Sequence, residues 1–72
     1  MSELDNIRQA WKMLQQDAEI VNYRDLCDIC ARNWDYSRMT VERAIALWQA
    51  KDEVKIQYVG ADCYIVPAAL LN

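Results

Sequence analysis

Hydrophobic residues near the start of the chain recur at spacings of three and four positions. The series comprises Leu4, Ile7, Trp11, Leu14 and Ala18. This spacing forms one apolar stripe along an amphipathic helix. The polar residues assigned to the solvent side are Arg8, Gln9, Lys12, Gln15 and Gln16. Because a serine at position 2 and an acid three positions later resemble a capping pair, the pattern predicts a first helix over Glu3–Ala18.

A short extended step and a second helix are predicted next. Ile20 and Val21 are β-prone, and Asn22 after them is a good N-cap residue. Asp25, three positions after the cap, suits the positive end of a helix. We therefore expect a second helix to begin at Tyr23.

The connection after this second helix has no glycine. It runs Ala31-Arg32-Asn33-Trp34-Asp35-Tyr36 and is about three residues longer than a tight helix-turn-helix turn. Either the second helix is extended, or the connection is an open loop that carries two aromatic residues. Trp34 is expected to cover the core, because tryptophan is usually well buried. Tyr36 is left open between a core role and a surface role.

A third helix is expected from Ser37, which serves as its N-cap, to about Lys51. Its buried stripe, at positions i, i+3, i+4 and i+7, comprises Val41, Ala44, Ile45 and Trp48.

The remaining residues predict a β-hairpin. Apolar and polar residues alternate over Val54–Tyr58, which is typical of a half-buried strand. Gly60–Asp62 forms the turn, and Gly60, as the only glycine of the chain, is expected to have a positive φ angle. The return strand covers Cys63–Val66 and ends at Pro67, which cannot donate to a ladder.

The segment from Asn22 to Val54 resembles the helix-turn-helix core of winged-helix domains. It reads Asn-Tyr-Arg-Asp-Leu-Cys-Asp-Ile-Cys, then Tyr-Ser-Arg-Met-Thr-Val-Glu-Arg-Ala-Ile-Ala-Leu-Trp, then Asp-Glu-Val. The resemblance implies a single α+β winged-helix domain over residues 1–72, with the order helix, strand, helix, helix, strand, strand. In this superfamily the last of these helices usually enters the major groove of DNA.

The resemblance also implies which side chains would contact DNA. Those implied to face base edges are Arg38, Met39 and Glu42. Those implied to lie near the phosphate backbone are Tyr36, Ser37, Thr40 and Arg43, and the wing would add Lys55 and Gln57. The alternative for Glu42 and Arg43 is that they only solvate the helix.

The charge of the chain leaves two functions open. The formal net charge is −3, and residues 36–60 carry four basic and three acidic side chains. Since affinity for nucleic acid comes largely from neutralising phosphates, we expect a DNA-binding regulator of transcription or replication to act as a homodimer. The surfaces expected to form that dimer are Leu70, Leu71 and the outer face of the first helix. The alternative is an acidic protein–protein interaction module, an assembly subunit or an inhibitor, that does not bind DNA.

The Cys27-x-x-Cys30 pair suggests zinc binding or thiol exchange, but a structural role is favoured. Zinc prefers four ligands, whereas only Cys63 remains and the chain has no histidine. Free cysteine packs as a small hydrophobic residue, so we expect no metal and no cofactor.

Neither catalysis nor a membrane location is indicated. Histidine, the commonest general base, is absent, and Ser2 and Ser37 are explained as helix caps, so we do not expect an enzyme. The N-terminus has no basic and apolar signal pattern. The apolar run Tyr64–Leu71 is much shorter than the roughly 20 residues that span a bilayer. A cytoplasmic location without a membrane partner is therefore expected.

Overall fold

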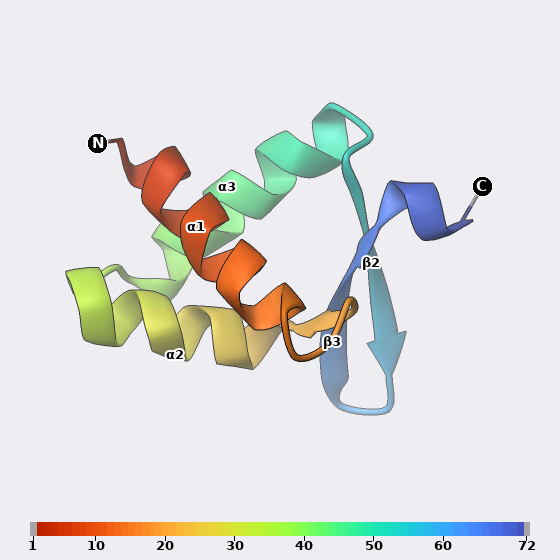
Figure 1. The fold of residues 1–72 in the computed structure, drawn as a ribbon, viewed down its shortest axis with the longest axis horizontal. Helices are drawn as coiled ribbons and strands as arrows, with labels where there is room; N and C mark the ends of the chain where they lie inside the picture. The colour runs from red at the N-terminus through yellow and green to blue at the C-terminus, as the bar shows by residue number, and fades with distance from the viewer. Residues whose placement is uncertain (1, 72) are drawn as a thin grey trace.

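A computed structural model describes residues 2–71, in which three helices pack at one side of a small antiparallel sheet (Figure 1). The elements are α1 (Glu3–Gln15), β1 (Val21–Asn22), α2 (Tyr23–Trp34), α3 (Arg38–Ala50), β2 (Val54–Val59), β3 (Asp62–Pro67) and a final 3-10 turn, η1 (Ala68–Leu71). The predicted α+β fold and element order are confirmed, and only η1 was not expected. Within residues 2–71 no helix is long and apolar enough to cross a lipid bilayer.

All three helices begin at the predicted caps. In each case the cap side chain accepts a hydrogen bond from a main-chain N–H of the first turn: Ser2 from Asp5 at 3.2 Å, Asn22 from Arg24 at 2.8 Å, and Ser37 from Thr40 at 3.3 Å. These bonds satisfy donors that have no partner inside the helix. Local sequence therefore fixes where each helix starts.

The first helix is shorter than predicted. It ends at Gln15 rather than Ala18, and the main-chain N–H groups of Asp17 and Ala18 both donate to the carbonyl of Leu14, at 3.1 and 3.2 Å. An acidic side chain such as Asp17 is unfavourable at the negative end of a helix. The chain reverses at this point so that β1 can reach the sheet.

The first strand is displaced by one residue from its predicted position. It covers Val21–Asn22 rather than Ile20–Val21, and Val21 pairs with Ile65 of β3. Ile20 is 44% exposed, whereas Val21 is buried. Alternation across the sheet allows only one of these two neighbours to face the core.

Two aspartates occupy positions after α2 and α3 where glycine is common. Helix α2 extends to Trp34, so the first of the two alternatives for this connection is correct, and Asp35 then adopts φ 57°. Asp52, which follows α3, similarly has φ 58°. Aspartate tolerates the left-handed region better than most residues, which lets both helices end sharply without glycine.

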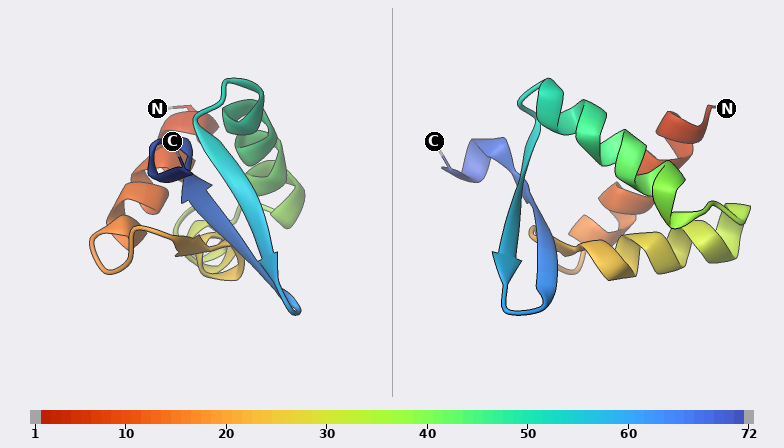
Figure 2. Two further views of the ribbon diagram at one scale, coloured as in Figure 1. Left: turned by 90° about the vertical axis from the view of Figure 1, so that its right-hand side faces the viewer. Right: turned by 180° about the vertical axis from the view of Figure 1, so that it is seen from behind.

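The hairpin is confirmed, with a shorter turn than expected. The sheet order is β1-β3-β2, and Val59 pairs with Asp62, so Asp62 belongs to the strand rather than the turn. Gly60 has φ 62°, the predicted positive angle. Figure 2 shows the hairpin extending away from the helices. For this reason Tyr58 is 78% exposed, although it lies on the same strand face as the buried Val54.

The core depends on a stacked pair of tryptophans that joins α1 to α3. The rings of Trp11 and Trp48 lie 5.1 Å apart at 29°. Arg8 covers them: its guanidinium carbon is 4.8 Å from the Trp48 ring centroid, and its Nη2 lies 2.7 Å from Oε2 of Glu53. The solvent-side assignment of Arg8 was therefore wrong, because its paired charge allows it to lie against the aromatic pair. The α1 stripe also needs correction at Leu4, which is 41% exposed.

The predicted stripe of α3 is fully buried. The core as a whole draws on all three helices and on the sheet. Including the α3 stripe, it comprises Ile7, Ala10, Trp11, Val21, Leu26, Cys30, Val41, Ala44, Ile45, Trp48, Val54 and Ile65.

Replacing Arg8 by alanine should lower the free energy of unfolding by about 1–2 kcal/mol. A partly exposed ion pair contributes about 0.2–1 kcal/mol, and a cation–aromatic contact about 0.5–1 kcal/mol. Lys12→Ala, on the exposed face of the same helix, is the matched control and should change stability by less than about 0.5 kcal/mol. Urea denaturation measures both, and equal effects would contradict the assigned role of Arg8.

Asp35→Gly should raise the free energy of unfolding by about 0.5–1 kcal/mol, because glycine adopts the left-handed region without a steric cost. The same change at Asp28, which is exposed within α2, should lower it by about 0.3–0.5 kcal/mol. Thermal or urea unfolding of the two variants gives the comparison. Destabilisation by both would refute the conformational argument.

Candidate nucleic-acid interface

The outward face of α3 carries most of the side chains that the winged-helix resemblance implied. Arg38, Glu42 and Arg43 are exposed, and Met39 is 59% exposed. The Nη2 of Arg43 lies 3.4 Å from the sulfur of Met39. Within residues 2–71 the salt bridges are Arg8–Glu53 and Lys55–Asp52, so neither arginine of α3 is paired with a carboxylate. Both guanidinium groups are available to an external anion.

The start of α3 is fixed by two hydroxyl groups. The Oγ of Ser37 lies 3.1 Å from Oγ1 of Thr40, in addition to capping the helix. Thr40 is half-buried and Ser37 is exposed. The first-turn amides of a helix favour a bound anion, so this end of α3 suits a phosphate group.

A groove separates α3 from the hairpin. Arg38 lies on one side, with its guanidinium carbon 5.7 Å from the centroid of the Tyr23 ring. The residues that line the groove are Tyr23, Arg38, Glu42, Ile45, Ile56, Tyr58, Ala61 and Cys63. Sequence reasoning missed Tyr23 and Tyr58 as site residues. Tyr58 could have been recognised from its position on the same strand face as Ile56, nearer the hairpin turn.

The two wing residues implied by the resemblance lie elsewhere. Lys55 and Gln57 alternate with the groove-lining Ile56 and Tyr58, so they occupy the opposite face of β2. The Nζ of Lys55 is 3.7 Å from Asp52 in an exposed ion pair, which contributes little stability. The structure therefore does not bring Lys55 and Gln57 together with the groove face of α3.

Tyr36 connects the turn before α3 to α1. Its ring stacks on Trp34 with a centroid separation of 5.6 Å, and its hydroxyl accepts a 2.9 Å hydrogen bond from Nδ2 of Asn6. Trp34 and Tyr36 are both partly buried against the core. The core role expected for Trp34 is confirmed, and Tyr36 also has a structural role.

Glu42 makes the groove nearly neutral. Burial raises the pKa of the Tyr23 phenol, and nearby Cys27 and Glu42 raise it further. The Tyr23 hydroxyl is buried without a hydrogen-bond partner among the described residues. Because Glu42 and Arg38 line the same groove, their charges offset each other there.

Two of the three cysteines, Cys27 and Cys30, belong to the core or pack against it. Cys30 is fully buried and Cys27 packs partly against the core. Burial raises the pKa of the Cys30 thiol from its ordinary value of 9.0 to about 11, with a smaller contribution from Cys27. Burial also raises the pKa of Cys27 and of Cys63. Thiols with raised pKa values are weak nucleophiles and weak metal ligands, and no group of His, Cys, Asp or Glu suited to a metal occurs within residues 2–71.

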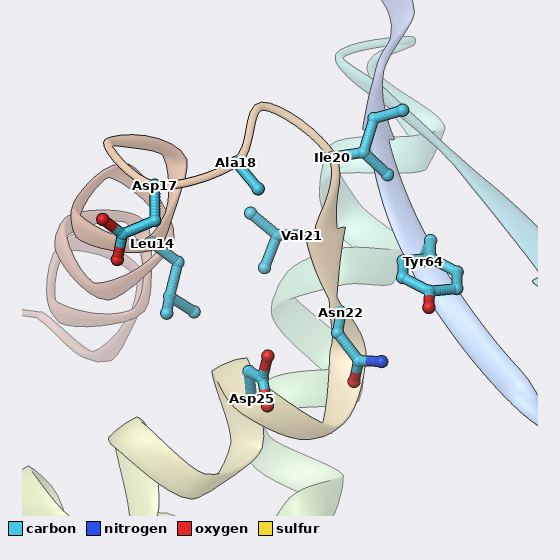
Figure 3. Close-up of a pocket in the computed structure, with 8 residues that line it drawn as sticks. All are labelled: Leu14, Asp17, Ala18, Ile20, Val21, Asn22, Asp25 and Tyr64. Carbon is cyan, nitrogen blue, oxygen red and sulfur yellow. The ribbon is translucent and has the colours of Figure 1, made fainter.

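A second hollow lies between the end of α1, β1 and the start of α2 (Figure 3). Its lining residues are Leu14, Asp17, Ala18, Ile20, Val21, Asn22, Asp25 and Tyr64. The charged groups that line it are the carboxylates of Asp17 and Asp25, and α3 contributes no lining residue. An acidic hollow repels phosphate, so the candidate interface remains on α3.

The sequence matches no protein-family model and no curated protein. Among solved structures, the chain is similar to HOP2, in a structure reported for its insights into DNA recognition and protein interaction domains and into homologous DNA pairing. The TM-score is 0.66 at 12% sequence identity, covering 92% of this chain and 98% of that chain. At this identity the similarity concerns the fold alone. Together with the element and strand order, it defines the protein as a small α+β domain of the winged-helix type.

The stability of the chain should fall in alkaline solution because of Cys30. The folded state keeps this thiol protonated to a higher pH than the unfolded chain does. The contribution of Cys30 to the free energy of unfolding is therefore complete below pH 9 and is lost as the pH rises towards its folded-state pKa of about 11. Each pH unit in that window costs about 1.4 kcal/mol. Urea denaturation between pH 8 and pH 11 should show this decline in the native chain and a shallower one in Cys30→Ala. Equal slopes would show that the thiol is not responsible.

Proposed function

We propose that this chain binds double-stranded DNA through α3, which would lie in the major groove. The observation that carries the proposal is the pair of exposed arginines, Arg38 and Arg43, which lie five positions apart on α3 and have no carboxylate partners within residues 2–71. Arginine suits guanine edges and phosphates through bidentate hydrogen bonds. The description of HOP2 as containing a DNA recognition domain supports the proposal by analogy.

We further propose that two copies of the chain act together, in the control of transcription or replication. One copy offers few phosphate contacts, since Glu42 lies beside Arg38 in the groove, and affinity grows with the number of phosphates neutralised. Two copies would also read two half-sites and so gain specificity. The exposed Leu70 and Leu71 of η1 and Met13 on the outer face of α1 are apolar surface available for that contact.

A protein-interaction function is the second candidate. An apolar groove between α1 and α3 favours it, lined by Glu3, Leu4, Ile7, Thr40, Arg43, Ala44 and Leu47. Leu4 and Leu47 remain 41% and 38% exposed there. The acidic net charge of −3 is compatible with a basic protein partner.

Arg38→Ala and Arg43→Ala should each weaken binding to a duplex of about 20 base pairs several-fold at low salt. Each should also reduce the slope of log affinity against log salt by about 0.9, because one phosphate contact is lost. Fluorescence anisotropy provides the measurement, at salt concentrations from roughly 50 to 200 mM, where phosphate contacts change the affinity strongly. Lys12→Ala on α1 is the control, since Lys12 is exposed and lines a hollow to which α3 contributes no residue. If the native chain does not bind duplex DNA at low salt, the proposal fails and the protein-interaction function is favoured.

A further inference from the structure

A small hollow joins the starts of α2 and α3 to the hairpin turn. Two arginines from different helices line it, Arg24 in the first turn of α2 and Arg38 at the first position of α3. The other lining residues are Asn22, Tyr23, Ala61, Asp62 and Cys63. Elements far apart in the sequence therefore bring two cations to one place.

Both arginines occupy positions that helix stability does not favour. The first turn of a helix is its positive end, where a cation is repelled and an anion is stabilised. The first turn of α3 contains no acidic residue. In α2 the acid in the first turn is Asp25, which lines the other hollow, that of Figure 3. The stability of these two helices therefore does not explain Arg24 or Arg38.

The two arginines have no salt-bridge partner in the described part of the chain. Neither Arg24, Arg38 nor Asp62 takes part in a salt bridge within residues 2–71. Asp62 is the one acidic residue of the lining, so the lining carries a net charge of one positive unit, and Glu42 lies with Arg38 in the neighbouring groove. An anion in the hollow would be attracted by both arginines and would receive charge-assisted hydrogen bonds from their guanidinium groups.

The hollow is also partly preorganised. The guanidinium group of Arg38 rests 5.7 Å from the centroid of the Tyr23 ring, a geometry that favours a cation. The Asn22 side chain holds the start of α2 by accepting from the Arg24 main-chain N–H at 2.8 Å. A ligand therefore meets an arginine already placed on an aromatic ring and a second arginine on a capped helix.

We propose that Arg24 and Arg38 together bind one phosphate group in this hollow, and that Asp62 limits its affinity. The inference deepens the DNA-binding function proposed above: the ligand is a backbone phosphate, and Arg24 is an added contact outside α3. A phosphate held between α2 and α3 fixes the orientation of the protein on the duplex, because phosphate contacts position a protein whereas base contacts specify the sequence.

The first experiment measures duplex DNA affinity by anisotropy for three single variants. Arg24→Ala should weaken binding about 3- to 10-fold and reduce the salt slope by about 0.9, as one phosphate contact is lost. Asp62→Asn should strengthen binding about 2- to 5-fold by removing a repulsive charge. Arg32→Ala, an exposed arginine in the last turn of the same helix, is the matched control and should have no effect.

The Arg24→Ala/Arg38→Ala double variant tests whether the two side chains share one phosphate. If they do, the double variant loses less affinity than the product of the two single losses, because contacts to one group are coupled. Multiplicative losses would mean separate phosphates and would overturn the shared site. Unfolding measurements on the same proteins should show no loss of stability for Arg24→Ala, which lies at an unfavourable helix position. The double variant should lose only the small stabilisation from the contact of Arg38 with the Tyr23 ring.

A second experiment does not depend on DNA. Titration of the protein with inorganic phosphate at pH 7, followed by NMR of the arginine side-chain Nε–H groups, should shift Arg24 and Arg38 in a saturating manner and leave Arg32 unchanged. Equal shifts at all three arginines, or none, would overturn the site. Phosphate binding in the hollow without DNA binding would refute only the proposed function. DNA binding that Arg24→Ala leaves intact would refute only this inference.

Discussion

The position of α3 depends on the stack of Trp11 on Trp48. This contact attaches the helix proposed to read DNA to α1, and Arg8 and Glu53 close over it. Glu53 also begins the connection to the sheet: its main-chain carbonyl accepts from Ala68, and its N–H donates to Trp48, both at 2.9 Å. One aromatic pair and one ion pair therefore join α1, α3 and the hairpin. In a chain of 72 residues, where the core is small, such a junction carries a large share of the stability.

Acidic and basic side chains gather in two neighbouring hollows that share Asn22. The hollow beside the end of α1 carries Asp17 and Asp25, whereas the hollow beside the hairpin turn carries Arg24 and Arg38. The acidic net charge is therefore a poor guide to the local field that an approaching ligand meets. Because the chain is acidic overall, a DNA interface on it has to rely on a few basic side chains gathered at one place. Arg24 and Arg38, which line the same hollow, are such a pair.

Several features of the candidate site had no signal in the sequence. Period-two alternation placed Lys55 and Gln57 on one strand face, but it could not say that this face points away from the groove beside α3. Arg24 carried no signal of a site, because Arg38 belongs to another helix and lines the same hollow only when α2, α3 and the hairpin pack. The exposure of Tyr58 similarly results from a hairpin that extends past the helices.

The sequence by itself determined the order of the elements, the starts of the helices and the buried stripe of α3. These follow from interactions within a few residues, such as caps, periodicity and the single glycine, whose preferences do not require the rest of the molecule. Only the tertiary structure decided that α2 extends to Trp34, that Arg8 lies over the tryptophans and that two helix starts share a hollow. Those outcomes depend on contacts between segments remote in sequence, where packing and charge neutralisation outweigh local preference.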